Sequence, residues 1–268
     1  MNEFQKILTK YWGHPHFRPL QETVIQSVVE KKDTLALMAT GGGKSITFQI
    51  PALYMEGLCI VITPLIALMK DQVEKLDQLG IKAVALHAGM QKDEIKIAIN
   101  TCLYGGYKFL YCSPERLGSE LFQARIKEAN INLIAVDEAH CISQWGYDFR
   151  PSYLQIPVLR DMHPEAPVLA LTATATPEVA DDIQEKLRFK KHNTIQSSFE
   201  RKNLTYLVRE IEDKDQYLVN HIRKMPGTGI IYVRNRKKTK EIANLLNKNG
   251  LSADYYHAGL NVAQREKK

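Results

Sequence analysis

The chain has 268 residues, of which 44% are hydrophobic and 25% charged, and its formal net charge is +6. This length and hydrophobic content predict a substantial core, in one large domain followed by part of another. The cysteines at 59, 102, 112 and 141 show no CxxC spacing, so neither a zinc knuckle nor a disulfide framework is implied. With no signal-peptide pattern and no apolar run of membrane-spanning length, we expect a cytoplasmic protein that does not enter a membrane.

Short apolar runs alternate with helical patterns through the first part of the chain. We predict strands in the runs at residues 35–38, 58–62, 83–86, 109–112, 133–136 and 168–171. A helical pattern follows each run. Gly80 is a plausible C-cap for the helix at 65–79, and Pro177 suits the first turn of the helix at 178–187. Nearly unbroken hydrophobic strands joined by helices are typical of an α/β fold whose parallel sheet is covered on both faces.

The alternation pauses at residues 189–203, a polar stretch that we interpret as a linker. Beyond it, strands are predicted at 204–208, 229–233 and 253–256, and helices at 215–224 and 237–249. The sequence therefore predicts a first domain over residues 1–199 and the incomplete, N-terminal part of a second α/β domain over residues 200–268.

Positive charge is concentrated in the second of these parts. Residues 200–268 hold 15 Lys and Arg against 8 Asp and Glu, whereas residues 1–199 are close to neutral. A basic lobe beside a neutral body suits a polyanion lying across both. Charge alone, however, favours the ordinary interpretation of a solvated cationic surface.

A glycine-rich loop lies between the strand predicted at 35–38 and the helical pattern at 46–54. It consists of Thr40, Gly41, Gly42, Gly43, Lys44 and Ser45. Glycines let successive backbone N–H groups face an anion, and a helix that starts near Lys44 adds its positive dipole end. We predict that the loop binds the phosphates of ATP, with Lys44 at the β and γ phosphates and Ser45 on Mg²⁺. Met38 replaces the usual first glycine of GxxxxGK[ST], which disfavours a small-molecule kinase and favours a helicase-type loop. A flexible turn is the alternative.

An acidic motif, Asp137-Glu138-Ala139-His140, directly follows the strand predicted at 133–136. Ligands of parallel sheets bind at the carboxyl ends of the strands, so this spacing places both carboxylates opposite the phosphate loop. We predict that Asp137 holds Mg²⁺ and that Glu138 orients and deprotonates the attacking water. A surface Asp-Glu turn is the alternative.

Together these motifs resemble those of superfamily 2 helicases, and in particular the RecQ-like DNA helicase family. Residues 17–21, Phe-Arg-Pro-Leu-Gln, resemble the family's adenine-recognition motif. The resemblance implies that Gln21 recognises the adenine edge and that Arg18 steadies the nucleotide. It also implies that His14 or Phe17 packs on the base. Taken alone, the stretch is equally compatible with a helix start that buries a phenylalanine.

Other stretches carry the resemblance further. Residues 63–72 resemble the first DNA-contact motif, which implies that Pro64 and Gln72 lie at the nucleic acid. Residues 113–117 resemble another contact motif, and residues 171–175 the motif that couples hydrolysis to DNA.

Residues 141–153 resemble the aromatic-rich loop of the RecQ-like family. Trp145, Tyr147 and Phe149 are then expected to stack on unpaired bases beside Arg150, each contact being worth about 1 to 3 kcal/mol. Aromatic residues at alternate positions could instead belong to a buried β face. A polar, glycine-containing loop joined to the acidic pair favours exposure.

The resemblance implies a RecA-like P-loop fold and an ATP-dependent 3′ to 5′ DNA helicase motor acting in DNA recombination and repair. ATP and Mg²⁺ are the implied cofactors, and single-stranded and partly duplex DNA the implied partner. Residues 230–236 and 256–260 resemble the opening motifs of the second motor domain, whereas motifs that carry the family's arginine finger are absent. We therefore expect weak turnover from this chain.

Two alternatives stay open at this point. One is an RNA-remodelling ATPase of the same superfamily, which the aromatic loop disfavours. The other is a nucleotide-gated DNA-binding module with little turnover, which the absent arginine finger favours.

Overall fold

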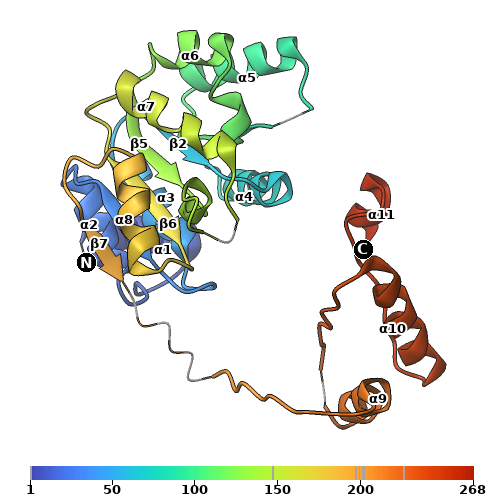
Figure 1. The fold of residues 1–268 in the computed structure, drawn as a ribbon. Coiled ribbons are helices and arrows are strands. Elements are labelled where there is room, and N and C mark those ends of the chain that lie inside the picture. The colour runs from blue at the N-terminus through green and yellow to red at the C-terminus, as the bar shows by residue number, and fades with distance from the viewer. Residues whose placement is uncertain are drawn as a thin grey trace. The chain divides into compact units, whose positions relative to one another are not determined.

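The structure is a computed structural model that describes residues 2–87, 89–146, 148–196, 198, 200, 203–225 and 227–268. The chain divides into two compact units, Met1–Glu200 and Arg201–Lys268 (Figure 1). Each unit has a hydrophobic core of its own.

A seven-stranded sheet forms the centre of the first unit (Figure 1). Its strands are β1 Thr34–Leu37, β2 Leu58–Ile62, β3 Ala83–Leu86, β4 Phe109–Cys112, β5 Ile131–Val136, β6 Val168–Thr172 and β7 Thr194–Gln196. All neighbours pair in parallel, in the order β3-β4-β2-β5-β6-β1-β7. The predicted α/β fold is therefore confirmed. Because β5, β6 and β1 are adjacent and parallel, the loops that follow them meet at one edge of the sheet.

Helices cover both faces of this sheet. They are α1 Glu3–Trp12, α2 Gln21–Val29, α3 Lys44–Tyr54, α4 Ile66–Gln78, α5 Lys92–Tyr104, α6 Glu120–Ile126, α7 Pro157–Met162 and α8 Pro177–Lys186, with 3-10 turns η1 Pro114–Arg116, η2 Ala139–Ile142 and η3 Pro151–Gln155. As predicted, Pro177 opens α8, and Gly80 follows α4 in a left-handed conformation, with φ of +73°. No helix in the described part of the chain is long and apolar enough to cross a bilayer.

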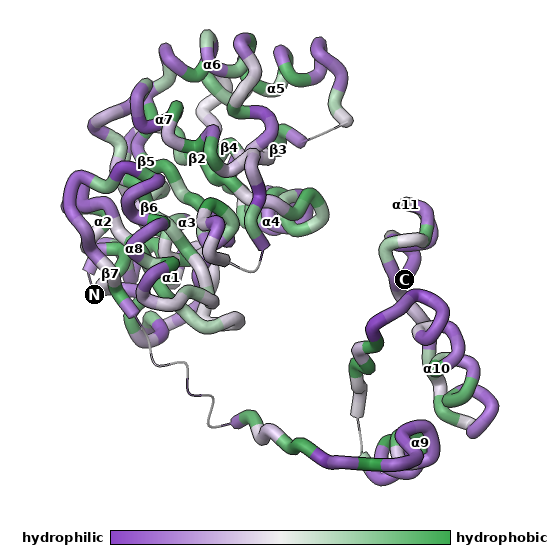
Figure 2. The backbone as a smooth tube through the Cα atoms, viewed as in Figure 1, coloured by the Kyte–Doolittle hydropathy of each residue, from purple (hydrophilic) through white to green (hydrophobic). Residues whose placement is uncertain are grey.

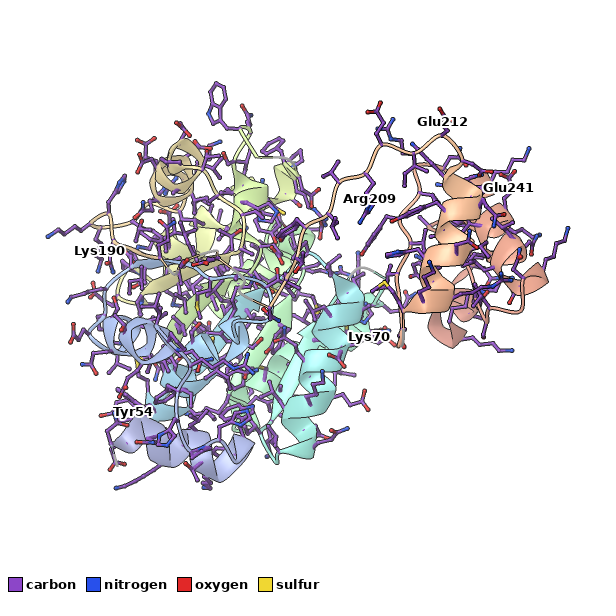
Figure 3. The ribbon with its side chains drawn as sticks, turned by 90° about the horizontal axis from the view of Figure 1, so that it is seen from below. Tyr54, Lys70, Lys190, Arg209, Glu212 and Glu241 are labelled. Carbon is purple, nitrogen blue, oxygen red and sulfur yellow. The ribbon has the colours of Figure 1, made fainter. Side chains whose placement is uncertain are left out.

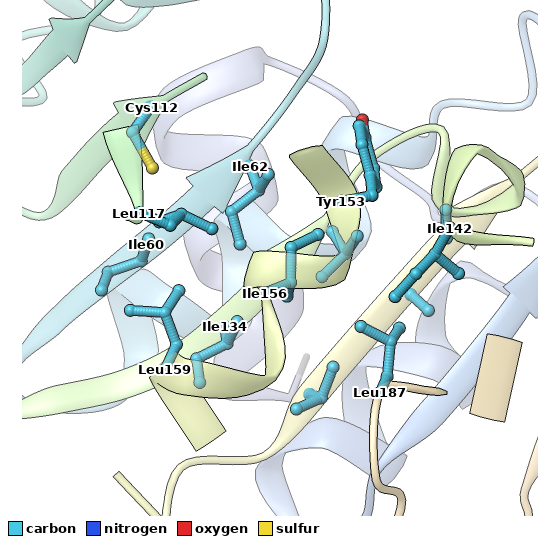
Figure 4. Close-up of a cluster of buried hydrophobic side chains, with 14 of the residues drawn as sticks. Ile60, Ile62, Cys112, Leu117, Ile134, Ile142, Tyr153, Ile156, Leu159 and Leu187 are labelled. Atoms are coloured by element: carbon cyan, nitrogen blue, oxygen red, sulfur yellow. The ribbon is translucent and has the colours of Figure 1, made fainter. Parts of the chain in front are cut away.

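Successive strand residues face opposite sides of the sheet, so each face has a separate core. Leu35 and Ile60 belong to the core under α5, α6, α7 and α8, part of which Figure 4 shows. Ala36 and Val61 belong to the core under α2, α3 and α4. Burial of both faces explains why the strands read as continuous apolar runs, and Figure 2 shows the strands largely in the hydrophobic colour.

The interpretation of residues 189–203 as a linker is wrong for β7. This strand pairs in parallel with β1, Leu35 lying opposite Thr194. Along β7 only Ile195 is half-buried, and its two neighbours are exposed. An edge strand of this kind packs on one face only, and it therefore gives no apolar run that a sequence pattern could detect.

Two buried polar residues, Asp33 and Arg160, link segments at the edge of the sheet where the strands begin. Asp33, directly before β1, accepts hydrogen bonds from Arg160 Nη2 at 2.7 Å and from the backbone N–H groups of Val168 at 2.9 Å and Lys190 at 2.7 Å. Arg160 also donates to the Ala166 carbonyl at 2.6 Å. The Asp33 carboxylate thus has three donors and ties the starts of β1 and β6 to the segment after α8.

The second unit contains α9 Lys214–Lys224, α10 Arg236–Lys248 and α11 Val262–Lys267, and its core includes Val219, Ile242 and Leu246. The helices predicted at 215–224 and 237–249 are confirmed to within one residue. Charged side chains such as Arg209, Glu212 and Glu241 are exposed on this unit (Figure 3).

The strands predicted in the second unit are not found. Residues 204–208, 229–233 and 253–256 form neither helix nor strand among the described residues. A strand needs a hydrogen-bonded neighbour, and β-forming residues favour strands only where their side chains have something to pack against. Here Val208 is 97% exposed and Tyr232 is 90% exposed.

Candidate nucleotide and nucleic-acid site

The phosphate loop joins β1 to α3, and its shape depends on glycine. Gly41 and Gly43 both have φ of +78°, a left-handed conformation that side chains disfavour. A Cβ on Gly42 would lie 2.8 Å from the Ala39 carbonyl oxygen, and one on Gly43 would collide with the Gln21 amide. The loop is therefore a tight turn against neighbouring backbone, which its three glycines permit.

Lys44 and Ser45 are the first two residues of α3, which confirms the predicted helix start. Their N–H groups belong to the helix terminus, where the backbone dipole favours an anion. Thr47 closes the first turn by donating its hydroxyl to the Lys44 carbonyl at 2.6 Å. Thr40 is exposed in the loop. The backbone at the loop and helix start therefore suits an anion, and the Lys44 side chain belongs to the same helix start.

The segment before α2 is bonded to the phosphate loop. Gln21 donates Nε2 to the Gly43 carbonyl at 3.0 Å and accepts from the Arg18 backbone N–H at 2.9 Å. Arg18 Nη1 donates to the Gly41 carbonyl. The predicted adenine motif is thus held against the predicted phosphate loop, although the two are about twenty residues apart in the sequence.

A cavity of about 470 Å³ lies beside this segment, within the usual range for small-molecule sites. Its lining includes His14, Arg18, Gln21, Gly43, Ser45 and Gln72. Phe17 instead packs on the cluster that Phe4, Leu8, Ile25 and Ile50 form. The structure therefore favours His14 over Phe17 as the side chain that packs on a base.

The acidic pair follows β5 directly. Asp137 donates its backbone N–H to the Ile62 carbonyl at 2.8 Å, and its side chain is buried, accepting from the Glu138 N–H at 3.0 Å. Glu138 has φ of +47°, a left-handed conformation that is strained for a residue with a side chain. Tyr153, fully buried in the core of Figure 4, donates its hydroxyl to the Asp137 carbonyl at 2.9 Å.

The pKa of Asp137 is raised to about 6, chiefly by burial and in addition by the neighbouring Glu138 carboxylate. The Lys44 ammonium acts in the opposite sense on this pKa. The phosphate loop and the acidic pair therefore lie within electrostatic reach of each other, as predicted from their positions at the ends of β1 and β5.

The raised pKa predicts how stability depends on pH. Because the pKa of Asp137 rises from 3.8 to about 6 on folding, its contribution to stability is fully present below pH 4 and is lost as the pH rises through 6. The difference between the folded and unfolded pKa of Asp137 corresponds to about 3 kcal/mol in the free energy of unfolding. We expect Asp137→Asn to raise the free energy of unfolding by about 2 to 3 kcal/mol at pH 7.5, without nucleotide or Mg²⁺, and by little at pH 4.

Urea unfolding at the two pH values measures this difference. Asp181→Asn, at an exposed position of α8, is the matched control and should change stability little at either pH. If Asp137→Asn raised the free energy of unfolding equally at pH 4 and pH 7.5, the expectation would be contradicted, because the effect would not depend on the charge of the Asp137 carboxylate.

A histidine connects the acidic pair to the end of β6. His140 Nδ1 lies 3.5 Å from Glu138 Oε2 and 2.9 Å from Thr172 Oγ1. Thr172 in turn accepts a hydrogen bond from the Thr174 N–H at 3.1 Å. His140, bonded to Thr172, therefore lies beside the Glu138 carboxylate, a placement that sequence reasoning did not identify. Their position in the DEAH motif and in residues 171–175 was the available signal.

The aromatic loop is exposed at its tip. Trp145 is 78% exposed and Phe149 is half-buried, and residues 141–146 and 148–153 contain 3-10 turns and no strand. Tyr147 lies outside the described residues. Trp145 is thus not a core aromatic on a buried β face. The Arg150 N–H donates to the Cys141 carbonyl at 2.8 Å and closes the loop.

The residues predicted at nucleic acid fall into two groups. Arg150 Nη1 donates to the Pro64 carbonyl at 3.4 Å, so these two lie together with the aromatic loop. Gln72 instead accepts from the Tyr111 hydroxyl at 3.0 Å and lines the cavity beside the phosphate loop. Its placement fits a nucleotide contact better than a DNA contact.

A parallel sheet with a glycine loop after β1 and a buried acidic pair after β5 defines a RecA-like P-loop protein. Residues 18–183 match the model of the DEAD/DEAH box helicase family. The chain belongs to this family.

Comparisons with individual proteins agree. The chain is 44% identical over 263 residues to the ATP-dependent DNA helicase RecQ of Bacillus subtilis, which covers 97% of this chain and 44% of the relative. It is 42% identical over 261 residues to the RecQ helicase of Pasteurella multocida, which covers 97% and 41%. The chain thus spans less than half the length of these curated relatives. The resemblance to RecQ-like helicases is confirmed.

Solved structures support the fold. DUF1998 helicase MrfA bound to DNA matches with a TM-score of 0.72 and 15% identity, over 100% of this chain and 42% of that one. A hypothetical ATP-dependent RNA helicase from Sulfolobus tokodaii matches with a TM-score of 0.58 and 20% identity, over 91% and 72%.

Proposed function

We propose that the chain is the ATP-hydrolysing part of a 3′ to 5′ DNA helicase motor of the RecQ type, acting in DNA recombination and repair. One observation carries the proposal: the phosphate loop lies within electrostatic reach of a buried acidic pair that an exposed aromatic loop follows directly. The curated relatives named above are ATP-dependent DNA helicases.

Three residues carry the chemistry in this proposal. Lys44 neutralises charge on the β and γ phosphates, and Glu138, oriented by His140, positions the attacking water and takes its proton. Ser45 and Asp137 hold Mg²⁺, which, when bound, neutralises phosphate charge. Both offer oxygen ligands of the kind that Mg²⁺ prefers, and a cation would relieve the unfavourable burial of the Asp137 carboxylate.

Nucleotide binding uses the loop glycines and the cavity beside them. The backbone of residues 40–43 cradles the phosphates, while Arg18, Gln21 and His14 surround the base. Phe17 supports this segment from the core side.

The nucleic acid partner is single-stranded and partly duplex DNA. Trp145 and Phe149 stack on bases, and Arg150 contacts the backbone phosphates from its position beside Pro64. One hydrogen bond ties the loop to the acidic pair, from the Tyr153 hydroxyl to the Asp137 carbonyl, and the loop begins at Cys141, directly after the acidic motif. Movement of the loop on DNA would therefore reach the acidic pair.

The second unit is proposed as the N-terminal part of a second RecA-like domain. Its helices α9 and α10 alternate with the segments 229–233 and 253–256, whose sequences favour strands, in the order that an α/β domain requires. Its excess of Lys and Arg suits a DNA backbone. Cytoplasmic residence is part of the same proposal.

Trp145→Ala tests the coupling. We expect it to keep basal ATPase activity but to lose most of the stimulation by single-stranded DNA, and to bind that DNA about 5- to 150-fold more weakly, because one stacked base contributes about 1 to 3 kcal/mol. ATP turnover with and without DNA, and DNA affinity by fluorescence anisotropy, measure these effects.

Tyr104→Ala is the matched control, since Tyr104 is 76% exposed at the end of α5 and lies outside the proposed site. Full stimulation of Trp145→Ala would remove the coupling role. Stimulation of the parent chain by RNA as strongly as by DNA would favour an RNA-remodelling ATPase. Tight DNA binding without turnover would favour a nucleotide-gated binding module.

A further inference from the structure

Three potential metal ligands converge beside the acidic pair. His140 and Cys141 lie on η2 and Asp148 lies on the aromatic loop, and one ligand atom of each is within 4.8 Å of the others. Cys141 Sγ is 3.7 Å from Asp148 Oδ2. The thiol is buried, the imidazole half-buried and the carboxylate exposed, so an ion can reach the cluster from the Asp148 side.

The chemistry of this cluster differs from that of the proposed Mg²⁺ site. Imidazole, thiolate and carboxylate are the ligand types that Zn²⁺ takes, and three protein ligands leave a fourth position for water. Mg²⁺ prefers oxygen ligands throughout. A histidine that binds zinc through one nitrogen normally hydrogen-bonds through the other, and His140 Nδ1 lies 2.9 Å from Thr172 Oγ1. The ligand atom assigned to His140 is therefore Nε2.

We propose that His140, Cys141 and Asp148 bind a divalent ion of the zinc class, and that the bound ion fastens the DEAH histidine to the aromatic loop. The thiol proton leaves to solvent as the metal–sulfur bond forms. The ion then links His140, which lies beside Glu138, to the loop that carries Trp145. It restricts the movement of both.

Substitution of Arg150 should change metal affinity in the opposite direction to substitution of the ligands. The Arg150 Nη2 lies 2.8 Å and its Nε 3.2 Å from Asp148 Oδ2. The guanidinium therefore competes with a metal ion for this carboxylate, and its positive charge repels the ion. Arg150→Ala should therefore strengthen metal binding, whereas Cys141→Ser and Asp148→Asn should weaken it. A loop that merely loses its order would not give opposite changes.

Co²⁺, a coloured substitute for Zn²⁺, provides the direct measurement. It is titrated into the metal-free chain without nucleotide or DNA, so that the result does not depend on the proposed function. We expect one equivalent to give a thiolate-to-cobalt charge-transfer band, which Zn²⁺ removes and excess Mg²⁺ does not. Absence of the band, or its removal by Mg²⁺, would overturn the site.

Variants identify the ligands. Cys141→Ser should abolish the band, and Cys102→Ser, at a buried cysteine of α5 outside the cluster, should keep it. Asp148→Asn replaces an exposed side chain and should lower affinity at least tenfold, since even indirect supports of a metal ligand are worth 10- to 100-fold. A band that survives Cys141→Ser, or equal affinity in the parent chain and Asp148→Asn, refutes the assignment.

Discussion

Lys44→Ala is expected to lower the ATPase rate by a factor of about 10² to 10³ or more and to weaken ATP binding. The reason is that its ammonium is the positive side chain at the start of α3, next to the loop that receives the phosphates. A single preorganised group that stabilises transition-state charge is typically worth about 2.7 to 4 kcal/mol. The fold should be unchanged, because Lys44 occupies the first turn of a helix whose core contacts come from residues such as Phe48 and Ala52.

Steady-state ATP turnover and nucleotide affinity measure this effect, with circular dichroism as the check on folding. Lys190→Ala is the matched control, because Lys190 is an exposed lysine in the segment between α8 and β7 (Figure 3). If Lys44→Ala hydrolysed ATP at a rate within a few-fold of the parent rate, the assignment of this loop as the phosphate-binding loop would be wrong.

Glu138→Gln separates binding from chemistry. We expect ATP and Mg²⁺ to bind with nearly unchanged affinity while hydrolysis falls about 10²- to 10⁴-fold, since an amide cannot take the proton of the attacking water. The side chain is similar in size, and the Glu138 backbone N–H that bonds to Asp137 is kept. Single-turnover hydrolysis beside nucleotide affinity measures the split.

Glu185→Gln on the exposed side of α8 serves as the control for charge loss alone. If Glu138→Gln lost nucleotide affinity and hydrolysis in equal proportion, Glu138 would be a binding residue and not the base.

Much of the fold could be predicted because the central strands are buried on both faces. The runs at 58–62 and 109–112 match β2 and β4 residue for residue. The edge strand β3 is only partly buried, but its run at 83–86 is apolar throughout and is predicted in full. The errors occur where a strand has no apolar run, or where an apolar run has no neighbouring strand. β7 is an edge strand with one inward residue, and the apolar segments of the second unit have β propensity without a hydrogen-bonded neighbour.

The candidate site shows the same division. The positions of the phosphate loop and the acidic pair could be predicted because each directly follows an apolar run that forms a strand. Contacts between distant segments had no such signal. His140 meets Thr172 thirty-two residues away, and Tyr153 bonds to the Asp137 carbonyl from the far end of the aromatic loop. The convergence of His140, Cys141 and Asp148 follows no recognised spacing either.

Asp33 and Asp137, at opposite ends of the same sheet, show how one fold treats two buried acids differently. The Asp33 carboxylate receives one arginine and two backbone donors. Asp137 receives one backbone donor and faces a second carboxylate. The Asp33 carboxylate is therefore fully paired within the protein, whereas the Asp137 carboxylate has one hydrogen-bond donor and only the Lys44 ammonium to oppose the Glu138 carboxylate. A cation that binds beside Asp137 would supply the positive charge that this carboxylate lacks. Such binding would also raise the stability of the folded state.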